Sequence, residues 1–232
     1  MDGTERSRRP TDATVDVWVR ESTPGAWVPP DSAAIAAGLD EHERARWARL
    51  ADRRDAAAYL LLHAMARREV GRILGRPPES LRFDRTCPDC GRQHGAPRLL
   101  DDPGLHLSLS RTRAVVALAL SQHGPVGVDV EPVDAVRFGG YGDVALHPGE
   151  RARGTEELTD ITTWVRKEAA LKALGVGLRI DPTSFATPAP GVPTDVVPGM
   201  PSVTVADLDV PRAYAAAVAL ESAVGALAVR AH

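Results

Sequence analysis

The sequence has few aromatic residues and no long apolar segment. Phe, Trp and Tyr make up 4% of the 232 residues, so the core must consist mainly of Val, Leu, Ala and Ile. The sequence contains no run of about 18 apolar residues that could form a membrane-spanning helix. Residues 1–12 are charged and lack the apolar segment of a secretory signal peptide. The sequence therefore predicts a cytoplasmic protein with no membrane partner.

The sequence also has no large excess of basic over acidic residues, or of acidic over basic residues. The chain has 28 Lys and Arg against 31 Asp and Glu, a formal net charge of -3. This balance gives no reason to expect nucleic acid as a partner. With 44% hydrophobic residues, the chain can bury one large core or two smaller ones. Its function must therefore come from local groups of residues.

Periodicity predicts helices and strands in both halves of the chain. Residues 1–12 are expected to be disordered and the next seven, "ATVDVWV", to form a strand. Residues 40–74 are rich in Ala, Leu and Arg, which predicts one long helix or two in tandem. After a Pro- and Gly-rich loop from Pro77 to Pro103, residues 105–121 alternate as one or two strands. "QHGP" then predicts a hairpin turn.

The second half repeats this organisation. A helix is expected over residues 159–174, ended by Gly175 as a C-terminal cap, and two strands over residues 201–209 and 213–222. We therefore predict two subdomains, 13–125 and 126–232, each with a helix and antiparallel strands.

Two acids interrupt the apolar strand "VGVDVEPV" (126–133). Side chains alternate along a strand, so Asp129 and Glu131 share one face while Val128 and Val130 share the other. Two adjacent carboxylates repel each other unless water or a cation separates them. The pair indicates either a solvated sheet face or a cation site.

The helix "ITTWVRKEAALKALG" (161–175) carries a second set of charges. Trp164, Glu168 and Lys172 follow one another at intervals of four, and a neighbouring stripe holds Lys167 and Leu171. One interpretation is an exposed Glu–Lys pair that contributes about 0.3 to 0.5 kcal/mol. The other is a functional face.

In order and spacing, the two segments resemble the signature of the 4′-phosphopantetheinyl transferases of the long, single-chain Sfp type. That signature pairs a G-[VI]-D-[VI]-E strand with a W-x-x-K-E-A-x-x-K helix. Both are complete here, in Gly127, Asp129 and Glu131, and in Trp164, Lys167, Glu168, Ala169 and Lys172.

The resemblance implies an α+β fold of two similar α/β subdomains in a pseudo-twofold arrangement, with the active site in the cleft between them. It implies transfer of the 4′-phosphopantetheine arm of coenzyme A to a serine of an acyl or peptidyl carrier protein, with release of 3′,5′-ADP. Such carriers serve polyketide, nonribosomal peptide or fatty acid synthesis. Because both halves lie in one chain, a monomer is expected.

The resemblance also implies roles for single residues. Asp129, Glu131 and Glu168 would bind Mg²⁺, which prefers carboxylate, water and phosphate oxygens. Lys167 and Lys172 would contact the phosphates of coenzyme A. Glu168 and Lys172 are the expected catalytic residues, with Glu168 as the acceptor of the serine proton.

Three positions depart from the family pattern, at Ala58, Ala96 and Leu109, where relatives often carry basic residues. Nearby groups suited to phosphate could compensate for them: Arg46, Arg53, Arg54, Arg98, Ser110 and Arg111. The departures leave open a non-catalytic homologue that binds coenzyme A or a carrier protein. The acids alone would also fit a Mg²⁺-dependent phosphohydrolase of another fold.

The two cysteines lie in "CPDCGRQH" (87–94). Zinc prefers four ligands, and only Cys87, Cys90 and His94 are available locally. The thioredoxin-like strand-to-helix context of a redox pair is absent. A tight turn with two reduced thiols is the favoured interpretation, with zinc and a redox pair as alternatives.

Overall fold

The protein is described from a computed structural model that covers residues 13–22, 37–136, 140–151, 157–221 and 226–232. The tail expected over residues 1–12 lies outside the described residues. Strands and helices mix along the chain, which confirms the α+β class. The strands are β1 (Ala13–Glu21), β2 (Phe83–Thr86), β3 (Gln93–Leu99), β4 (His106–Arg111), β5 (Val115–Ser121), β6 (Val126–Pro132), β7 (Val203–Asp207), β8 (Tyr214–Glu221) and β9 (Leu227–Ala231). The helices are α2 (Glu41–Trp47), α3 (Arg53–Leu74), α4 (Tyr141–Ala145), α5 (Pro148–Arg151) and α6 (Glu157–Ala173).

The helical segment of the first half forms two helices in tandem. Asp52 caps α3 by accepting hydrogen bonds from the backbone amides of Arg54 and Asp55, and this cap separates α3 from α2. In the second half, α6 ends as predicted. Gly175 has a left-handed φ of 66°, and the Val176 amide donates to the Leu171 carbonyl.

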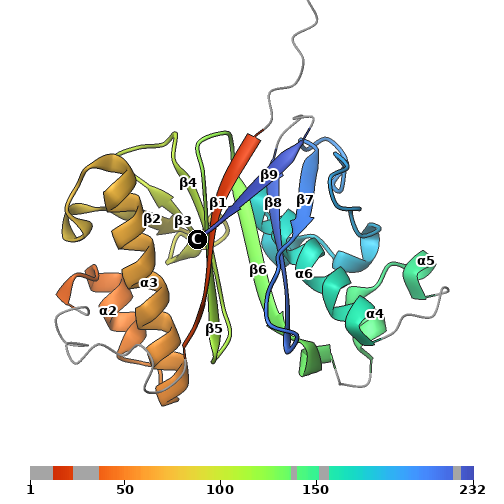
Figure 1. The fold of residues 1–232 in the computed structure, drawn as a ribbon, viewed down its shortest axis with the longest axis horizontal. Helices are drawn as coiled ribbons and strands as arrows, with labels where there is room; N and C mark the ends of the chain where they lie inside the picture. Colours follow the sequence, from red (N-terminus) through yellow and green to blue (C-terminus); the bar gives the residue numbers. More distant parts are fainter. Residues whose placement is uncertain (1–12, 23–36, 137–139, 152–156, 222–225) are drawn as a thin grey trace, which may run out of the picture.

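The main elements form four layers, α3, sheet, sheet and α6 (Figure 1). One sheet has the order β4-β5-β1-β9 and the other β6-β8-β7. Strand alternation explains the packing, because β5 directs Leu118 towards α3 and Ala117 towards the second sheet. Likewise, β8 directs Val218 to the inter-sheet core and Ala217 to α6. Each sheet therefore packs one helix on its outer face.

The hairpin predicted at "QHGP" is wrong. Strands β5 and β6 flank this turn, but they belong to different sheets. β6 instead pairs antiparallel with β8, in the register Asp129 opposite Ala217. Two side chains of β4 reach β6, since the Ser108 and Ser110 hydroxyls accept hydrogen bonds from the amides of Val128 and Val130. The turn therefore carries the chain from one half to the other.

Two further strand pairings were missed by the sequence patterns. The loop expected between Pro77 and Pro103 contains the β2–β3 hairpin. The last strand, β9, returns to the first sheet and pairs parallel with β1 (Figure 1). The subdomain boundary near residue 125 is therefore crossed by the C-terminal strand. Within the described residues, no helix has both the length and the apolarity to cross a bilayer.

Candidate active site

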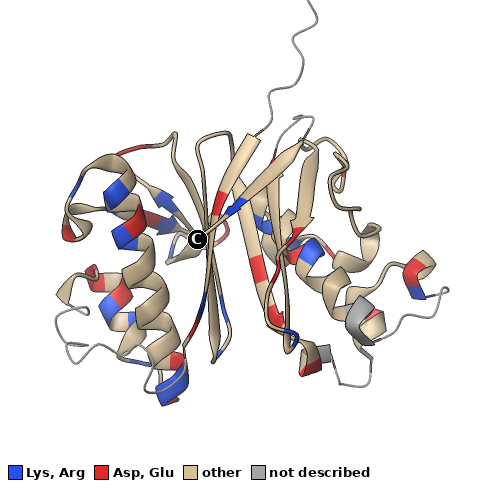
Figure 2. Cartoon of the chain, viewed as in Figure 1, with Lys and Arg blue, Asp and Glu red and all other residues tan. Residues whose placement is uncertain are grey.

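The acidic face of β6 is turned towards α6. Val126, Val128 and Val130 lie in the core between the sheets, so Asp129 and Glu131 occupy the opposite face. Figure 2 shows acidic positions along β6. Gly127 allows α6 to approach this face, because a Cβ at this position would lie 1.9 Å from the Ala169 carbonyl oxygen. The alternation in this strand therefore places both acids beside the motif helix.

Asp129 is the centre of a polar cluster between β4, β6 and α6. Its side chain is 4% exposed, and its Oδ1 accepts from Lys172 Nζ at 2.6 Å and from Ser110 Oγ at 2.8 Å. Lys172 also donates to the Val128 carbonyl at 3.1 Å. Three residues expected at the site, from three different elements, thus meet directly.

Glu131 and Glu168 complete the acidic group. Burial raises the pKa of Glu131 to about 7; the charges of Asp129 and Glu168 also raise it, and Lys172 opposes the rise. Burial likewise raises the pKa of Glu168, with a further contribution from Asp129. The carboxylates of Glu131 and Glu168 therefore lie in a partly desolvated site, where their negative form is disfavoured.

Two oxygens of this group fit a bound cation. Asp129 Oδ2 and Glu168 Oε1 are buried and have no hydrogen-bond partner among the described residues. A buried acceptor without a partner is unfavourable, and a hard dication such as Mg²⁺ takes oxygen ligands of this kind. The ligand oxygens of Asp129, Glu131 and Glu168 do not all lie within 4.8 Å of one another.

Lys167 differs from the expectation that it contacts phosphate. It is fully buried, and its Nζ donates to Ala145 O at 3.0 Å, Glu150 Oε2 at 2.8 Å and Pro182 O at 2.8 Å. An ammonium has three donors, and here all three are used by a side chain with no exposed surface, so none remains for a ligand. Lys167 thus joins α6 to the segments around it, and its role in this conformation is structural.

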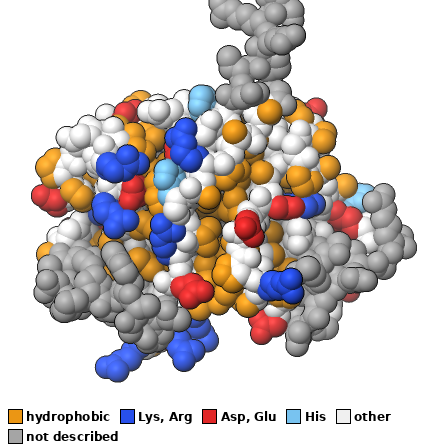
Figure 3. All heavy atoms as spheres, in the orientation of Figure 1, with side chains coloured by type: hydrophobic (Ala, Val, Ile, Leu, Met, Phe, Trp, Pro, Cys, Tyr) orange, Lys and Arg blue, Asp and Glu red, His pale blue; other side chains and the backbone are white. Residues whose placement is uncertain are grey.

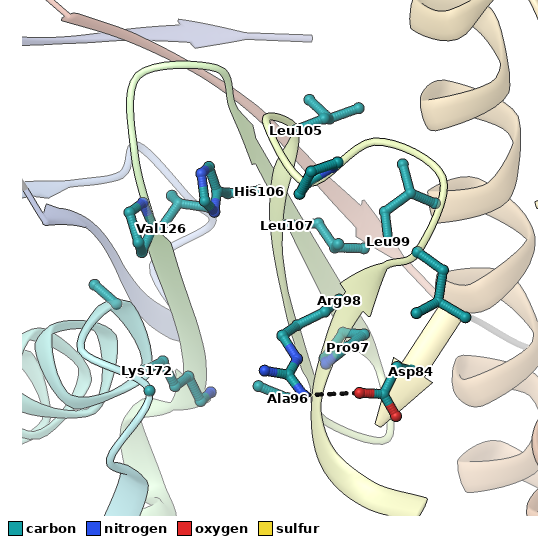
Figure 4. Close-up of a pocket in the computed structure, with 15 residues that line it drawn as sticks. Asp84, Ala96, Pro97, Arg98, Leu99, Leu105, His106, Leu107, Val126 and Lys172 are labelled. Carbon is teal, nitrogen blue, oxygen red and sulfur yellow. Dashed lines mark hydrogen bonds and ion pairs between the residues drawn. The ribbon is translucent and has the colours of Figure 1, made fainter. Parts of the chain in front are cut away.

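A cavity of about 520 Å³ lies between the two halves. We call it the main cavity. Figure 4 shows Lys172 on the α6 side and Arg98 on the β3 side, where Arg98 pairs with Asp84 at 2.7 Å. Ala96, one of the three positions that depart from the family pattern, also lines this cavity.

A smaller pocket of about 210 Å³ lies beside Ser110, and we call it the arginine pocket. Its lining includes Arg46 and Arg111 from the predicted set, together with Leu109. Arg111 forms an ion pair with Asp55 and lies over the ring of Tyr59, 5.6 Å from its centroid. On the face of the molecule drawn in Figure 3, most of the visible Lys and Arg side chains lie on the half that contains α3.

Two predicted arginines lie elsewhere. Arg53 and Arg54 are exposed in the first turn of α3, outside the lining of both cavities. Ala58, about one turn further along, is fully buried against the first sheet, where a basic side chain would have no solvent. The structure therefore brings Arg46, Arg98, Ser110 and Arg111 to cavity walls, but not Arg53 or Arg54.

Sequence patterns missed a buried charged network behind the arginine pocket. Glu43 Oε1 accepts from Arg85 Nη2 at 2.5 Å and lies 3.0 Å from His63 Nδ1, while Arg67 Nε donates to Oε2 at 2.8 Å. Arg85 and His63 also line the pocket. The available signal was the position of His63 and Arg67 four residues apart on the buried face of α3.

Comparison with known proteins shows which family has a similar sequence around this site. Residues 125–196, which include β6 and α6, match the model of the 4′-phosphopantetheinyl transferase superfamily. The chain is also 24% identical over 157 residues to the 4′-phosphopantetheinyl transferase gsp of Aneurinibacillus migulanus. That match covers 65% of this chain and 62% of the relative's length. The matched segment contains both motifs, so this part of the chain is similar to the 4′-phosphopantetheinyl transferase superfamily.

Proposed function

We propose that this protein is a Mg²⁺-dependent 4′-phosphopantetheinyl transferase. It would transfer the phosphopantetheine arm of coenzyme A to a serine of an acyl or peptidyl carrier protein of polyketide, nonribosomal peptide or fatty acid synthesis. The observation that carries the proposal is the pair of buried, unpartnered oxygens on Asp129 and Glu168, next to the Lys172 ammonium.

The reaction replaces the phosphoanhydride bond of coenzyme A by a phosphodiester bond to serine. The serine oxygen forms a bond to the phosphorus of the pantetheine arm, the bond from that phosphorus to 3′,5′-ADP breaks, and the serine proton must be removed. In the proposal, Glu168 accepts this proton and Lys172 donates to a phosphate oxygen. Asp129, Glu131 and Glu168 would hold Mg²⁺ once their carboxylates move closer together than in this conformation, and the bound ion would neutralise negative charge on the pyrophosphate.

The remaining residues bind and orient coenzyme A. Lys172 and Arg98 face the main cavity from opposite halves, so a pyrophosphate there would contact cations of both. Arg46, Arg85 and Arg111 would supply bidentate donors in the arginine pocket. These arginines can replace the basic groups missing at Ala96 and Leu109. On this proposal the two halves form two subdomains in the pseudo-twofold arrangement of the family. The protein would be a monomer and would act in the cytoplasm.

The test is transfer to an apo carrier protein in the presence of coenzyme A and Mg²⁺, followed by intact-mass spectrometry. The wild type should add the phosphopantetheine mass, and Asp129→Ala should not. Asp134→Ala, which removes an exposed acid just after β6, is the matched control and should retain transfer. Tight coenzyme A binding by calorimetry, with no mass gain on any of a broad panel of carriers, would instead establish a non-catalytic homologue.

A further inference from the structure

The turn of the β2–β3 hairpin brings three side chains with soft or borderline donor atoms together. Cys87 follows β2 directly, Cys90 lies in the turn, and His94 is the second residue of β3. Their Sγ, Sγ and imidazole nitrogen atoms all lie within 4.8 Å of one another, with Cys90 Sγ 2.9 Å from His94 Nε2. In the part of the chain that the structure describes, no other three His, Cys, Asp or Glu side chains meet this criterion.

The backbone holds the two thiols on the same side of the turn. The Cys87 amide donates to Arg92 O, and the Gly91 amide donates to Cys87 O, both at 2.8 Å. Gly91 has a φ of 70°, a left-handed conformation that a residue with a side chain rarely adopts. The turn is therefore fixed by its own hydrogen bonds, with both sulfurs near the His94 ring.

The surroundings favour the ionised form of the exposed thiol. Arg92 Nε lies 3.5 Å from Cys90 Sγ, and a neighbouring guanidinium stabilises a thiolate. Cys87 is buried beside the hairpin, so the pair is only partly open to solvent. Thiolate and imidazole ligands select zinc over magnesium, which prefers oxygen.

We propose that Cys87, Cys90 and His94 supply three of the four ligands of a zinc ion. Zinc takes four ligands, and the exposed position of Cys90 leaves the fourth site open to water. Asp89 is the neighbouring acid, but its Oδ1 pairs with Arg179 Nη1 at 3.2 Å, in the second half of the chain. Asp89 Oδ2 lies 3.9 Å from Cys87 Sγ, but Asp89 is not within 4.8 Å of all three donor atoms, so water remains the fourth ligand in this conformation.

The position of the site indicates that a bound metal would stabilise the β2–β3 hairpin. β2 and β3 form a sheet of only two strands, which is marginally stable without further support. The same hairpin carries Arg98 and Ala96 at the main cavity, and Gln93 and His94 at the arginine pocket. A metal at its tip would hold these walls in place, separately from the carboxylates of β6 and α6.

The experiment measures the metal content of the full chain, purified under reducing conditions without affinity metals, by inductively coupled plasma mass spectrometry. About one zinc per chain is expected for the wild type. Cys90→Ser and His94→Ala should lose most of it, whereas His123→Ala, the matched exposed histidine, should retain it. Asp129→Ala should also retain zinc, which separates this site from the carboxylate site whether or not transfer is observed.

Cobalt substitution supplies a readout that does not depend on any variant. Co²⁺ added to the metal-free wild type should give the near-ultraviolet absorption of thiolate-to-cobalt charge transfer, and zinc should abolish it. Zinc content equal in wild type and Cys90→Ser would overturn the proposal. So would a metal-free wild type without the cobalt absorption, or one whose mass shows a Cys87–Cys90 disulfide.

Discussion

The two lysines of the α6 motif have different surroundings although they lie five positions apart on one helix. At about 100° per residue, they point in directions about 140° apart. Each ammonium has three acceptors, at 2.8 to 3.0 Å for Lys167 and at 2.6 to 3.4 Å for Lys172. Lys167 lies on the buried stripe with Leu171, whereas Lys172 is 29% exposed beside Asp129. Their contributions should therefore separate into stability and activity.

Replacing each lysine by methionine tests this separation. Lys167→Met leaves the Glu150 carboxylate without its buried partner, so the free energy of unfolding should fall by about 3 to 5 kcal/mol in urea titrations. Activity per folded molecule should change little. Lys172→Met removes a phosphate donor and should lower kcat/KM for transfer by about 100-fold or more, with a smaller loss of stability. Equal effects of the two variants on activity would contradict these roles.

At the scale of elements, the crossing of α6 over β6 depends on Gly127. A Cβ there would lie 1.9 Å from Ala169 O and 2.6 Å from Ala173 N, both backbone atoms of α6. Backbone atoms cannot rotate aside as a side chain can, so any larger residue must displace the helix that carries Glu168 and Lys172.

Gly127→Ala should therefore lower the free energy of unfolding by at least about 1 to 3 kcal/mol, the range for overpacked cores. It should also reduce transfer, because it moves α6 relative to Asp129. Gly142→Ala is the control: the nearest atoms to its Cβ lie 3.7 Å away, an ordinary contact. Urea unfolding of both variants provides the measurement, and a stable, fully active Gly127→Ala would refute the close approach.

A buried ion network joins α2, α3 and β2. Burial alone would raise the pKa of Glu43, but the hydrogen bond and charge of His63 and the charges of Arg85 and Arg67 lower it to about 2. Asp40, at the N-terminus of α2, pairs with both arginines. A carboxyl with a lowered folded pKa stabilises the fold above its unfolded pKa of 4.5 and loses this effect as the pH falls through 2.

The stability advantage of the wild type over Glu43→Gln should therefore shrink by about 3 kcal/mol as the pH falls from 5 towards 2. Glu41→Gln, which removes an exposed acid from the same first turn of α2, is the matched control. Urea titrations at several pH values measure both differences. A pH-independent difference for Glu43→Gln would show that the network does not lower this pKa.

Local periodicity predicted the parts of the site that depend on one element at a time. Alternation placed Asp129 and Glu131 on one face of β6, and helical spacing placed Lys167 and Leu171 on one stripe of α6, but it did not predict that this stripe is buried. Partnerships between distant segments were not predictable in this way. Arg85 reaches Glu43 only because the β2–β3 hairpin forms, and the sequence pattern gave that segment as a loop. The pairing of β6 with β8 and that of β9 with β1 likewise join segments that lie far apart in the sequence.

For the whole molecule, the two halves share a core. Val17 and Ala119 from the first sheet pack with Val128 and Val218 from the second, all fully or almost fully buried. The C-terminal strand adds a second connection, since His232 stacks on Trp18 with ring centroids 4.4 Å apart. Neither sheet can expose its inner face to water without losing this apolar burial.

The chain should accordingly unfold in one cooperative transition rather than half by half. Trp18 lies in β1 and Trp164 in α6, so variants that retain only one of them, with the other tryptophans changed to Phe, report on each half. Their fluorescence in urea should give coincident midpoints and slopes, matching far-ultraviolet circular dichroism. If the halves were independent, the Trp164 signal would change at a different urea concentration from the Trp18 signal. Deleting residues 226–232, which removes β9, should lower the midpoint for both probes together, because the lost pairing with β1 weakens the shared core rather than one half.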